Sequence, residues 1–272
     1  MKIAKRATIL IFISSLVIWG YGRSLVKKQD VTPPVISSES TEFHIDAANG
    51  SSGLLEGLTA KDDVDGDLTA NIIVGSISPF KEKGISDVEY IVFDSSDNVG
   101  RYERTVHFDN YESPTFQLSK ALVYELNGEI NISDRITATD MLEGDISDKI
   151  RFSSPNFMKD EEGTYILRAE VKNSYGDAVK LELPINVVRY SCDRECIQLN
   201  EYLVYMKQGE RLSPWTYIEK ITDRLGEPVS GEQVRITRDV DYNRPGTGQI
   251  CYELYENDKV VYATYLTVIV TE

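Results

Sequence analysis

The sequence predicts an all-β protein built from three tandem β-sandwich domains that follow an N-terminal hydrophobic helix. Hydrophobic and polar residues alternate along short segments, and turns rich in Asp, Gly, Ser and Asn separate these segments. The same pattern returns about every 80 residues. Alternation with a period of two is typical of a strand that buries one face. Several short strands in each repeat favour a two-layer sandwich.

The N-terminal segment predicts export. The basic stretch "MKIAKR" precedes "ATILIFISSLVIWGYG", which carries no charge. We therefore expect residues 1–29 to be a signal anchor or transmembrane segment, with a cleaved signal peptide as the alternative. The anchor predicts a single-pass protein of the cell membrane, with a cytoplasmic N-terminus and the bulk outside; cleavage predicts secretion. As a helix the uncharged run extends only about 24 Å, short of a hydrocarbon core of about 30 Å.

The first two repeats share an acidic turn. The stretch "TAKDDVDGDLTANI" covers Thr59–Ile72, and "TATDMLEGDISDKI" covers Thr137–Ile150. Aligned, the two stretches have Ala, Asp, Gly and a second Asp at the same positions. The function of the acidic cluster therefore has to be considered as a property of a repeated unit.

The long strands of the three repeats also align. The predicted inward-facing residues are Val88, Tyr90 and Val92 in the first repeat, Leu167, Ala169 and Val171 in the second, and Ile250, Tyr252 and Leu254 in the third. The last strands supply Val106 and Phe108, Ile185 and Val187, and Val268 and Val270. These alignments predict domains over residues 30–110, 111–189 and 190–272. Short junctions without Gly/Ser linkers predict limited bending between them.

Composition and motifs exclude several classes of function. The formal net charge of −15 repels phosphate backbones, so we expect no nucleic-acid partner. The chain has no G-x-S-x-G, no H-E-x-x-H and no phosphate-binding glycine loop. His107 lies between two predicted core residues and is expected at the surface, and no partner is predicted for His44. We expect no enzyme activity.

Three stretches of the first repeat resemble the bacterial surface-protein Ig-like domains, which are related to hyalin-repeat and pesticidal-crystal-protein Ig-like modules. They are "DVTPPVI", "GLTAKDDVDGDLTANIIV" and "YIVFDSSDNVG". The resemblance is strong over Asp30–Asn110, fair over Glu112–Val188 and weak in the third repeat. It implies Ig-like sandwiches arrayed in tandem in an exported protein, a spacer or adhesive role, and no shared catalytic residues.

The acidic turn has three interpretations. A structural turn is favoured, because Asp side chains accept hydrogen bonds from nearby backbone N–H groups and Gly admits positive φ. A bound calcium ion is the alternative, with Asp62, Asp63, Asp65, Asp67, Asp94 and Asp97 as candidate ligands. An EF-hand is excluded, because Lys61 and Ile72 would occupy its first and last ligand positions. A catalytic pair of carboxylates would need a substrate cleft, which nothing in the sequence indicates.

The number and spacing of the three cysteines do not indicate a zinc site. Cys192 and Cys196 lie close enough in sequence to form a disulfide loop, and Cys251 remains. Cys251 aligns with outward-facing residues, so it is expected either half-buried under a loop or paired with another thiol, in this chain or a second one. The two histidines and three cysteines are too scattered for a zinc ligand set. No cofactor other than calcium is predicted.

We therefore predict a non-enzymatic, membrane-tethered surface protein with an Ig-like stalk and a binding or adhesive module. A scaffold subunit of an envelope complex and a calcium-stabilised spacer without a ligand of its own are the alternatives. A protein or glycan ligand is expected at the third repeat, where aromatic residues gather. These are Tyr202, Tyr205, Trp215, Tyr217, Tyr242, Tyr252, Tyr255, Tyr262 and Tyr265.

Overall fold

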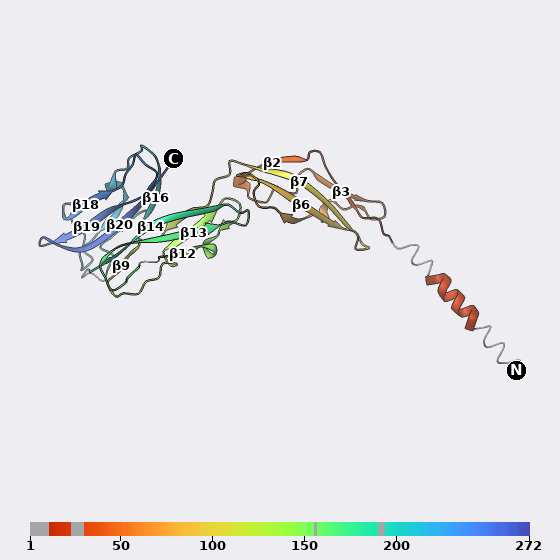
Figure 1. Ribbon diagram of the computed structural model, residues 1–272, viewed down its shortest axis with the longest axis horizontal. Helices are drawn as coiled ribbons and strands as arrows, with labels where there is room; N and C mark the ends of the chain where they lie inside the picture. Colours follow the sequence, from red (N-terminus) through yellow and green to blue (C-terminus); the bar gives the residue numbers. More distant parts are fainter. Residues whose placement is uncertain (1–10, 23–29, 155–156, 190–193) are drawn as a thin grey trace. The chain divides into compact units, whose positions relative to one another are not determined.

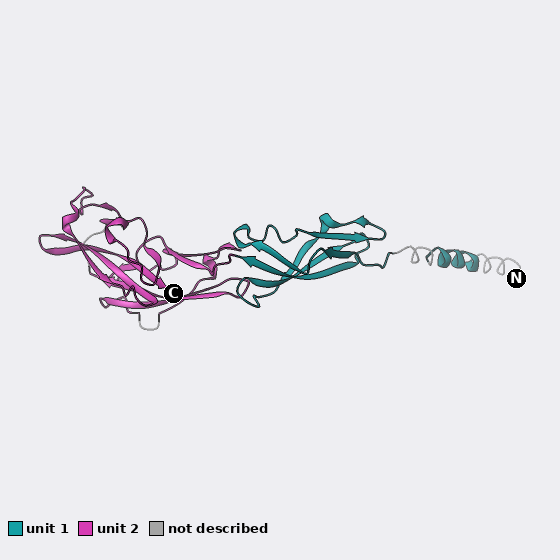
Figure 2. Ribbon diagram, turned by 90° about the horizontal axis from the view of Figure 1, so that it is seen from above, with its two compact units in different colours: residues 1–109 teal, residues 110–272 magenta. Residues whose placement is uncertain are grey.

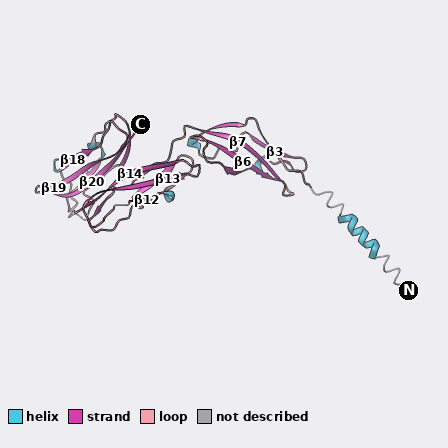
Figure 3. Ribbon diagram, viewed as in Figure 1, coloured by secondary structure: helices cyan, strands magenta, loops and turns pink. Residues whose placement is uncertain are grey.

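The computed structural model describes residues 11–22, 30–154, 157–189 and 194–272. Residues 11–22 form a helix, and the remaining described segments are strands joined by turns and short 3-10 helices (Figure 3). The predicted all-β fold is confirmed.

The first repeat has two sheets. The smaller contains β1 (Val35–Ser38), β3 (Leu58–Asp62) and β4 (Gly66–Asp67), in the order β1-β3-β4. The larger has the order β2-β7-β6-β5, with β2 (Glu42–Asp46), β5 (Ile73–Ile77), β6 (Ile85–Phe93) and β7 (Val99–Asp109). The 3-10 helices η1 (Ala47–Asn49) and η2 (Thr69–Asn71) lie in the connections.

The second repeat follows the same plan. Its smaller sheet, β11-β10-β8, contains β8 (Thr115–Leu118), β10 (Ile136–Asp140) and β11 (Gly144–Asp145). Its larger sheet, β12-β13-β14-β9, contains β9 (Val123–Glu125), β12 (Arg151–Ser153), β13 (Gly163–Lys172) and β14 (Ala178–Val188). The 3-10 helix η3 (Ser147–Lys149) takes the place of η2.

The third repeat keeps the larger sheet and reduces the smaller one. β15 (Ile197–Leu199) pairs with β17 (Ile218–Ile221). The larger sheet, β16-β20-β19-β18, contains β16 (Leu203–Lys207), β18 (Val234–Asp239), β19 (Gly246–Glu256) and β20 (Lys259–Thr271). The 3-10 helices are η4 (Pro214–Tyr217) and η5 (Gly231–Gln233).

Each larger sheet contains one parallel strand pair at its edge. These pairs are β2 with β7, β9 with β14, and β16 with β20, whereas the other pairings in the sheets are antiparallel. In each case an early short strand lies beside the last long strand of its repeat (Figure 1). The repeated sequence pattern therefore corresponds to a repeated sheet topology.

The predicted core residues are confirmed. All nine inward-facing residues of β6, β13 and β19 that the alternation identified are at most 1% exposed. The six predicted residues of β7, β14 and β20 are at most 4% exposed. Burial of large apolar side chains on one face of each long hairpin is the main stabilising contribution to such a fold.

The chain separates into two compact units, residues 1–109 and 110–272, coloured separately in Figure 2. The second and third repeats thus belong to one unit. Their buried residues form a single hydrophobic cluster that includes Phe116 and Ile185 as well as Val204 and Leu266. The division into three domains at residues 30–110, 111–189 and 190–272 stays a prediction.

Polar contacts join the second and third repeats within this unit. The backbone N–H of Phe116 donates a hydrogen bond of 2.9 Å to the hydroxyl of Tyr205. The Asn186 side-chain amide donates to Oε1 of Gln249 at 3.0 Å, and Gln249 Nε2 donates to the Pro184 carbonyl. The repeats are therefore joined by specific hydrogen bonds as well as by apolar packing.

The prediction of membrane localisation is wrong. Within the described part of the chain, no helix has both the length and the apolar composition needed to cross a membrane. Residues 11–22 as a helix extend about 18 Å, which is well short of a core of about 30 Å. The described residues do not include 1–10 and 23–29 of the predicted signal anchor. Most of the sequence that bears on a cleaved signal therefore lies outside them.

A buried arginine holds the first unit together. Arg104 is 2% exposed, and its guanidinium donates hydrogen bonds to the carbonyls of Leu54 and Glu56 and to the Tyr90 hydroxyl. The guanidinium also lies 4.0 Å from the centroid of the Phe43 ring. The carbonyls belong to the segment between η1 and β3, so Arg104 on β7 ties this segment to the larger sheet.

We expect Arg104→Met to lower the free energy of unfolding of the first unit by about 2–5 kcal/mol, because it leaves buried acceptors without donors. Urea denaturation followed by circular dichroism measures the loss. The matched control is Arg101→Met on the same strand, whose ion pair with Glu89 is exposed and is worth about 1 kcal/mol or less. Equal losses for the two variants would contradict a special role for Arg104.

Candidate functional site

Four carboxylates gather in the loops of the first unit. Asp30 precedes β1, Asp62 ends β3, Asp65 lies in the β3–β4 turn, and Asp94 follows β6. Each offers one oxygen to a group in which the ligand atoms lie within 4.8 Å of one another. Elements distant in sequence thus place four negative charges in one small volume.

Backbone and side-chain donors hold each of these carboxylates. Asp62 Oδ1 accepts hydrogen bonds from the N–H groups of Val64 and Asp65, at 2.8 and 2.9 Å. Asp65 Oδ2 accepts from both the N–H and the hydroxyl of Ser95 at 2.9 Å. Gly66 has φ +77°, a conformation that Gly adopts without strain, which allows the turn after Asp65. The turn therefore positions Asp65 against the β6–β7 loop.

Asp94 is held most tightly. Its Oδ1 accepts from the N–H groups of Ser96 and Asn98 at 2.8 Å, and its Oδ2 accepts from Asn98 Nδ2 at 2.7 Å. Burial opposes ionisation of Asp94, but the hydrogen bonds from Asn98 and Ser96 outweigh it and hold the pKa of this carboxyl below its ordinary value of 3.8. The same Asn98 amide donates to the Asp30 carbonyl. Asp94 is therefore ionised at neutral pH.

Two inner oxygens of the cluster accept no hydrogen bond. Asp30 Oδ2 and Asp62 Oδ2 are buried, and no donor among the described residues reaches them. No ion pair between a described Lys or Arg and any of the four carboxylates is found. A buried carboxylate oxygen without a donor is costly, so the cluster has the charge and the free lone pairs to bind a cation.

The second repeat has the equivalent loops, but in these loops neutral side chains donate hydrogen bonds to the carboxylate. Asp140 accepts from the N–H groups of Leu142 and Glu143, as Asp62 does in its turn. Its other oxygen, however, accepts from the Asn173 side-chain amide at 3.0 Å and from the Tyr111 hydroxyl at 3.2 Å. Asn173 aligns with Asp94, and Tyr111 precedes β8 as Asp30 precedes β1. Neutral donors thus replace two of the four acids.

In the second and third repeats, basic side chains neutralise acids of the equivalent loops. Glu143, which aligns with Asp65, pairs with the ammonium of Lys149. In the third repeat Glu256 aligns with Asp94 and pairs with the guanidinium of Arg224 at 2.8 Å. In each later repeat a basic side chain therefore pairs with an acid of these loops, and no such pair is found for the four carboxylates among the described residues of the first repeat.

The structure brings together three of the six predicted calcium ligands: Asp62, Asp65 and Asp94. Three others, Asp63, Asp67 and Asp97, are not part of the group. Asp67 accepts from the N–H of Thr69, and hydrogen bonds from that residue lower the Asp67 pKa. Asp97 has φ +65° in the β6–β7 loop, so both residues serve the turns.

Asp30 is a member of the cluster that the sequence pattern did not indicate. It lies in "DVTPPVI", the stretch that opens the repeat, and was assigned no role. The alternation of hydrophobic and polar residues gives no information about Asp30, because this residue precedes the first strand. The only available signal was the acidic residue at the start of a repeat whose loops were already acidic.

The predicted cysteine pairing lies partly outside the described residues, since Cys192 is not described. Cys196 is buried. The half-buried interpretation of Cys251 is confirmed, and burial raises the pKa of its thiol to about 11. At neutral pH this thiol is protonated and weakly nucleophilic.

The aromatic residues of the third repeat divide between core and surface. Tyr202 and Tyr252 are buried, and Trp215 is half exposed. Tyr205 is 40% exposed, but its hydroxyl bonds to the backbone of the second repeat. The predicted aromatic contact surface is therefore smaller than the composition indicated.

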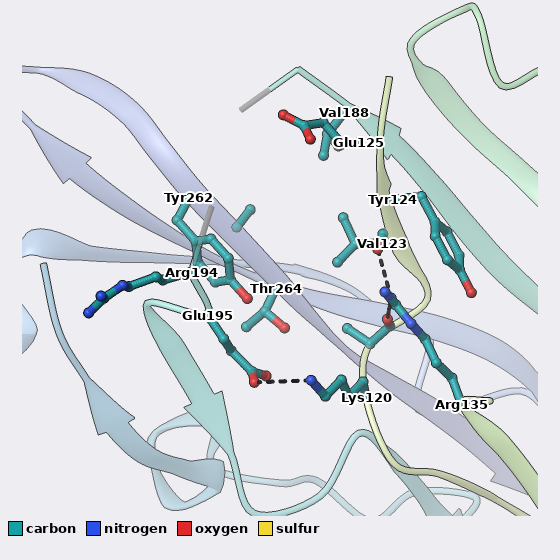
Figure 4. A pocket seen from close by; sticks show the side chains of 12 residues that line it. Lys120, Val123, Tyr124, Glu125, Arg135, Val188, Arg194, Glu195, Tyr262 and Thr264 are labelled. Carbon is teal, nitrogen blue, oxygen red and sulfur yellow. Dashed lines mark hydrogen bonds and ion pairs between the residues drawn. The ribbon is translucent and has the colours of Figure 1, made fainter. Parts of the chain in front are cut away.

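A hollow of about 260 Å³ lies between the second and third repeats in the unit of residues 110–272 (Figure 4). It is lined by Lys120, Ala121, Val123, Tyr124, Glu125, Arg135, Val188, Arg194, Glu195, Tyr262, Ala263 and Thr264. Lys120 and Glu195 point toward each other, with Nζ and Oε2 3.9 Å apart. The Arg135 guanidinium donates to the carbonyls of Ala121 and Val123.

Thr264 gives this hollow an unused polar group. The residue is 1% exposed, and its Oγ1 has no hydrogen-bond partner among the described residues. A buried hydroxyl is usually satisfied, so Thr264 is an exception beside the hollow.

No family model matches the chain. A pesticidal crystal protein from Bacillus thuringiensis is 24% identical over 204 residues, which are 72% of this chain and 27% of that protein. The chain thus spans about a quarter of the length of this curated relative.

Solved structures give weaker likenesses. The first three extracellular domains of Drosophila N-cadherin are 12% identical, with 87% of this chain and 99% of that chain covered and a TM-score of 0.29. The M60 catalytic domain of Clostridium perfringens ZmpB with its CBM51 domains is 11% identical, with 82% and 37% covered and a TM-score of 0.25.

We expect Lys149→Met to destabilise the second unit at neutral pH by about 1–3 kcal/mol, because it leaves half-buried Glu143 without its cation. Although burial raises the pKa of Glu143, hydrogen bonds from Lys149 and Ser174 hold it below 4.5. The wild-type pair therefore stabilises the fold above about pH 4.5, and this contribution is lost as the pH falls through the lowered folded-state pKa.

Urea unfolding followed by Trp215 fluorescence at pH 6 and pH 3 measures this difference. The Lys149→Met chain should lose less stability on acidification than the wild type. The control is Lys180→Met, whose ion pair with Glu170 is exposed and should contribute little. An unchanged pH dependence in Lys149→Met would show that the pair does not act as described.

Proposed function

We propose that the chain is a non-enzymatic extracellular module of the spacer and binding type, whose first unit is stabilised by a bound calcium ion. The observation that carries this proposal is the group of Asp30, Asp62, Asp65 and Asp94, with its two buried oxygens that accept no hydrogen bond. The later repeats, in which side chains supply the cation, support it.

The geometry favours calcium over other metal ions. Two oxygens that bind the same calcium ion at 2.3–2.6 Å lie at most about 5 Å apart, and the four carboxylates meet this condition at 4.8 Å. Calcium prefers six to eight oxygen ligands and tolerates irregular geometry, so water would complete the shell. Magnesium demands a near-ideal octahedron, and zinc prefers nitrogen and sulfur ligands.

The arrangement of the ligands supports an extracellular role. They come from three segments that are distant in sequence and not from a single ion-binding segment, and most of their oxygens already accept hydrogen bonds. Such a site is expected to bind in the range of about 10⁻⁴–10⁻³ M that is typical of extracellular modules.

The hydrogen bonding of the cluster supports a non-enzymatic role. General acid–base catalysis needs two acids with separated pKa values that face a substrate. Of the four, Asp94 has its pKa held below the ordinary value against the effect of burial, and the hydrogen bonds that lower it come from the loop residues Asn98 and Ser96. These carboxylates therefore serve loop geometry and ion binding.

A second proposed function is glycan binding at the hollow in residues 110–272. Its volume of about 260 Å³ suits a single sugar ring, and it is lined by Tyr262 and the Lys120–Glu195 pair, with the buried, unpartnered Thr264 hydroxyl in its wall. Binding clefts commonly combine aromatic walls with a few fixed polar groups. A scaffold role, with a protein partner seated on this face, is the competing proposal.

Calcium at 10 mM should raise the free energy of unfolding of the first unit by about 1.4–2.7 kcal/mol, if the dissociation constant is about 0.1–1 mM. Thermal melting followed by circular dichroism then shows a shift of several degrees. Magnesium should give a smaller shift.

The matched variants are Asp62→Asn and Asp63→Asn, which make the same charge change in the same turn. Only Asp62→Asn should abolish the calcium-dependent shift, because Asp63 lies outside the cluster. No shift in the wild type at 10 mM calcium, or an equal shift in both variants, would refute the calcium site.

Thr264→Val tests the proposed glycan site in two ways. Because Oγ1 is buried and unpartnered, its replacement by a methyl group should leave the free energy of unfolding unchanged or raise it by about 1 kcal/mol. The same variant should lose binding to a panel of monosaccharides, measured by saturation-transfer NMR on the full chain. Undiminished binding in Thr264→Val, or no binding of any sugar by the wild type, would count against this site.

A further inference from the structure

The two histidines of the chain lie side by side in the first unit. The sequence contains only His44 and His107, and they are direct neighbours in the parallel pairing of β2 with β7. Their rings stack with centroids 4.5 Å apart and an interplanar angle of 19°. Sequence separation concealed this juxtaposition, and it is the reason why no zinc site was predicted.

A carboxylate fixes one of the rings. Nδ1 of His44 lies 3.0 Å from Oδ1 and 3.2 Å from Oδ2 of Asp109. A carboxylate accepts a hydrogen bond, so this contact places the proton on Nδ1 and leaves the lone pair on Nε2. The same carboxylate–imidazole arrangement orients histidines that bind metal ions in proteins.

The surroundings of the pair are accessible and acidic. The side chains of His44 and Asp109 are 59% and 51% exposed. Glu42 and Asp46 are exposed at alternate positions of β2, two residues to either side of His44. On the other side of His107 lies Ile85 of β6, its partner in the sheet. A cation can therefore approach the rings from solvent through a region of negative charge.

We propose that His44 and His107 form a binding site for a divalent transition metal ion such as Zn²⁺, Ni²⁺ or Cu²⁺. Nε2 of His44 and one ring nitrogen of His107 are the ligands once the His107 ring turns about its Cβ–Cγ bond out of the stack, because imidazole lone pairs lie in the ring plane. Asp109 positions the His44 ring, and water completes the coordination. Imidazole suits these ions, and their affinities should follow the order in which Cu²⁺ exceeds Ni²⁺ and Zn²⁺. Calcium and magnesium prefer oxygen ligands and should not bind here.

This site is separate from the carboxylate cluster. Asp94 precedes the 11-residue strand β7, whereas His107 and Asp109 lie at its end. A strand of this length extends about 35 Å. The proposal therefore stands independently of the calcium site, and failure of one leaves the other intact.

The test is a Zn²⁺ titration of the full chain followed by proton NMR of the imidazole rings. Because the chain has two histidines, each ring gives its own signals. Both sets should shift together with one midpoint, and calcium should leave them unchanged. Two different midpoints, or no shift of either ring, would overturn the proposal.

Variants separate the roles of the residues. His44→Ala should weaken Zn²⁺ binding at the remaining His107 ring at least tenfold, and Asp109→Asn should weaken it about 10–100-fold while both rings still bind. The control is Glu103→Gln, an exposed change on the same strand away from the pair. Wild-type affinity in His44→Ala would show that the rings do not share an ion.

Discussion

The loops at the ends of β3 and β10 depend on one interaction, a carboxylate that accepts the backbone N–H groups two and three residues further on. Asp62 and Asp140 make this contact with almost the same distances. Asp223 does so after β17, with N–H groups two and four residues on. The contact closes each turn, but it also leaves a second carboxylate oxygen that needs a partner. The repeats differ in what they supply to that oxygen and to the acids around it.

Charge compensation distinguishes the repeats. In the second repeat the Tyr111 hydroxyl and the Asn173 amide satisfy Asp140, and Lys149 neutralises Glu143. In the third repeat Arg224 neutralises Glu256. The described residues of the first repeat place four carboxylates together without such a group, so we infer that an external cation does there what side chains do elsewhere. The repeats thus share one turn but differ in the charges that surround it.

Alternation along β6, β13 and β19 was sufficient to predict the core, because strand periodicity determines which side chains face inward. The larger four-stranded sheet recurs in each repeat, whereas the smaller sheet is reduced to two strands in the third. Contacts between distant residues could not be predicted in this way. Asp30 joins the cluster through the path of the chain before β1, and His44 meets His107 through a parallel pairing that leaves no local signal. The common core of the second and third repeats depends on side-chain packing that periodicity does not encode. The apolar N-terminal run indicated a membrane span, but the described helix is too short for one.

The number of calcium ions bound per chain tests the central claim most directly. Equilibrium dialysis of the full chain against calcium concentrations up to 10 mM measures this number. We predict one ion, because among the described residues the first repeat alone combines four carboxylates with buried oxygens that lack donors. A result of no bound ion would contradict the account, and a result of three would show that Lys149 and Arg224 do not replace calcium in their repeats.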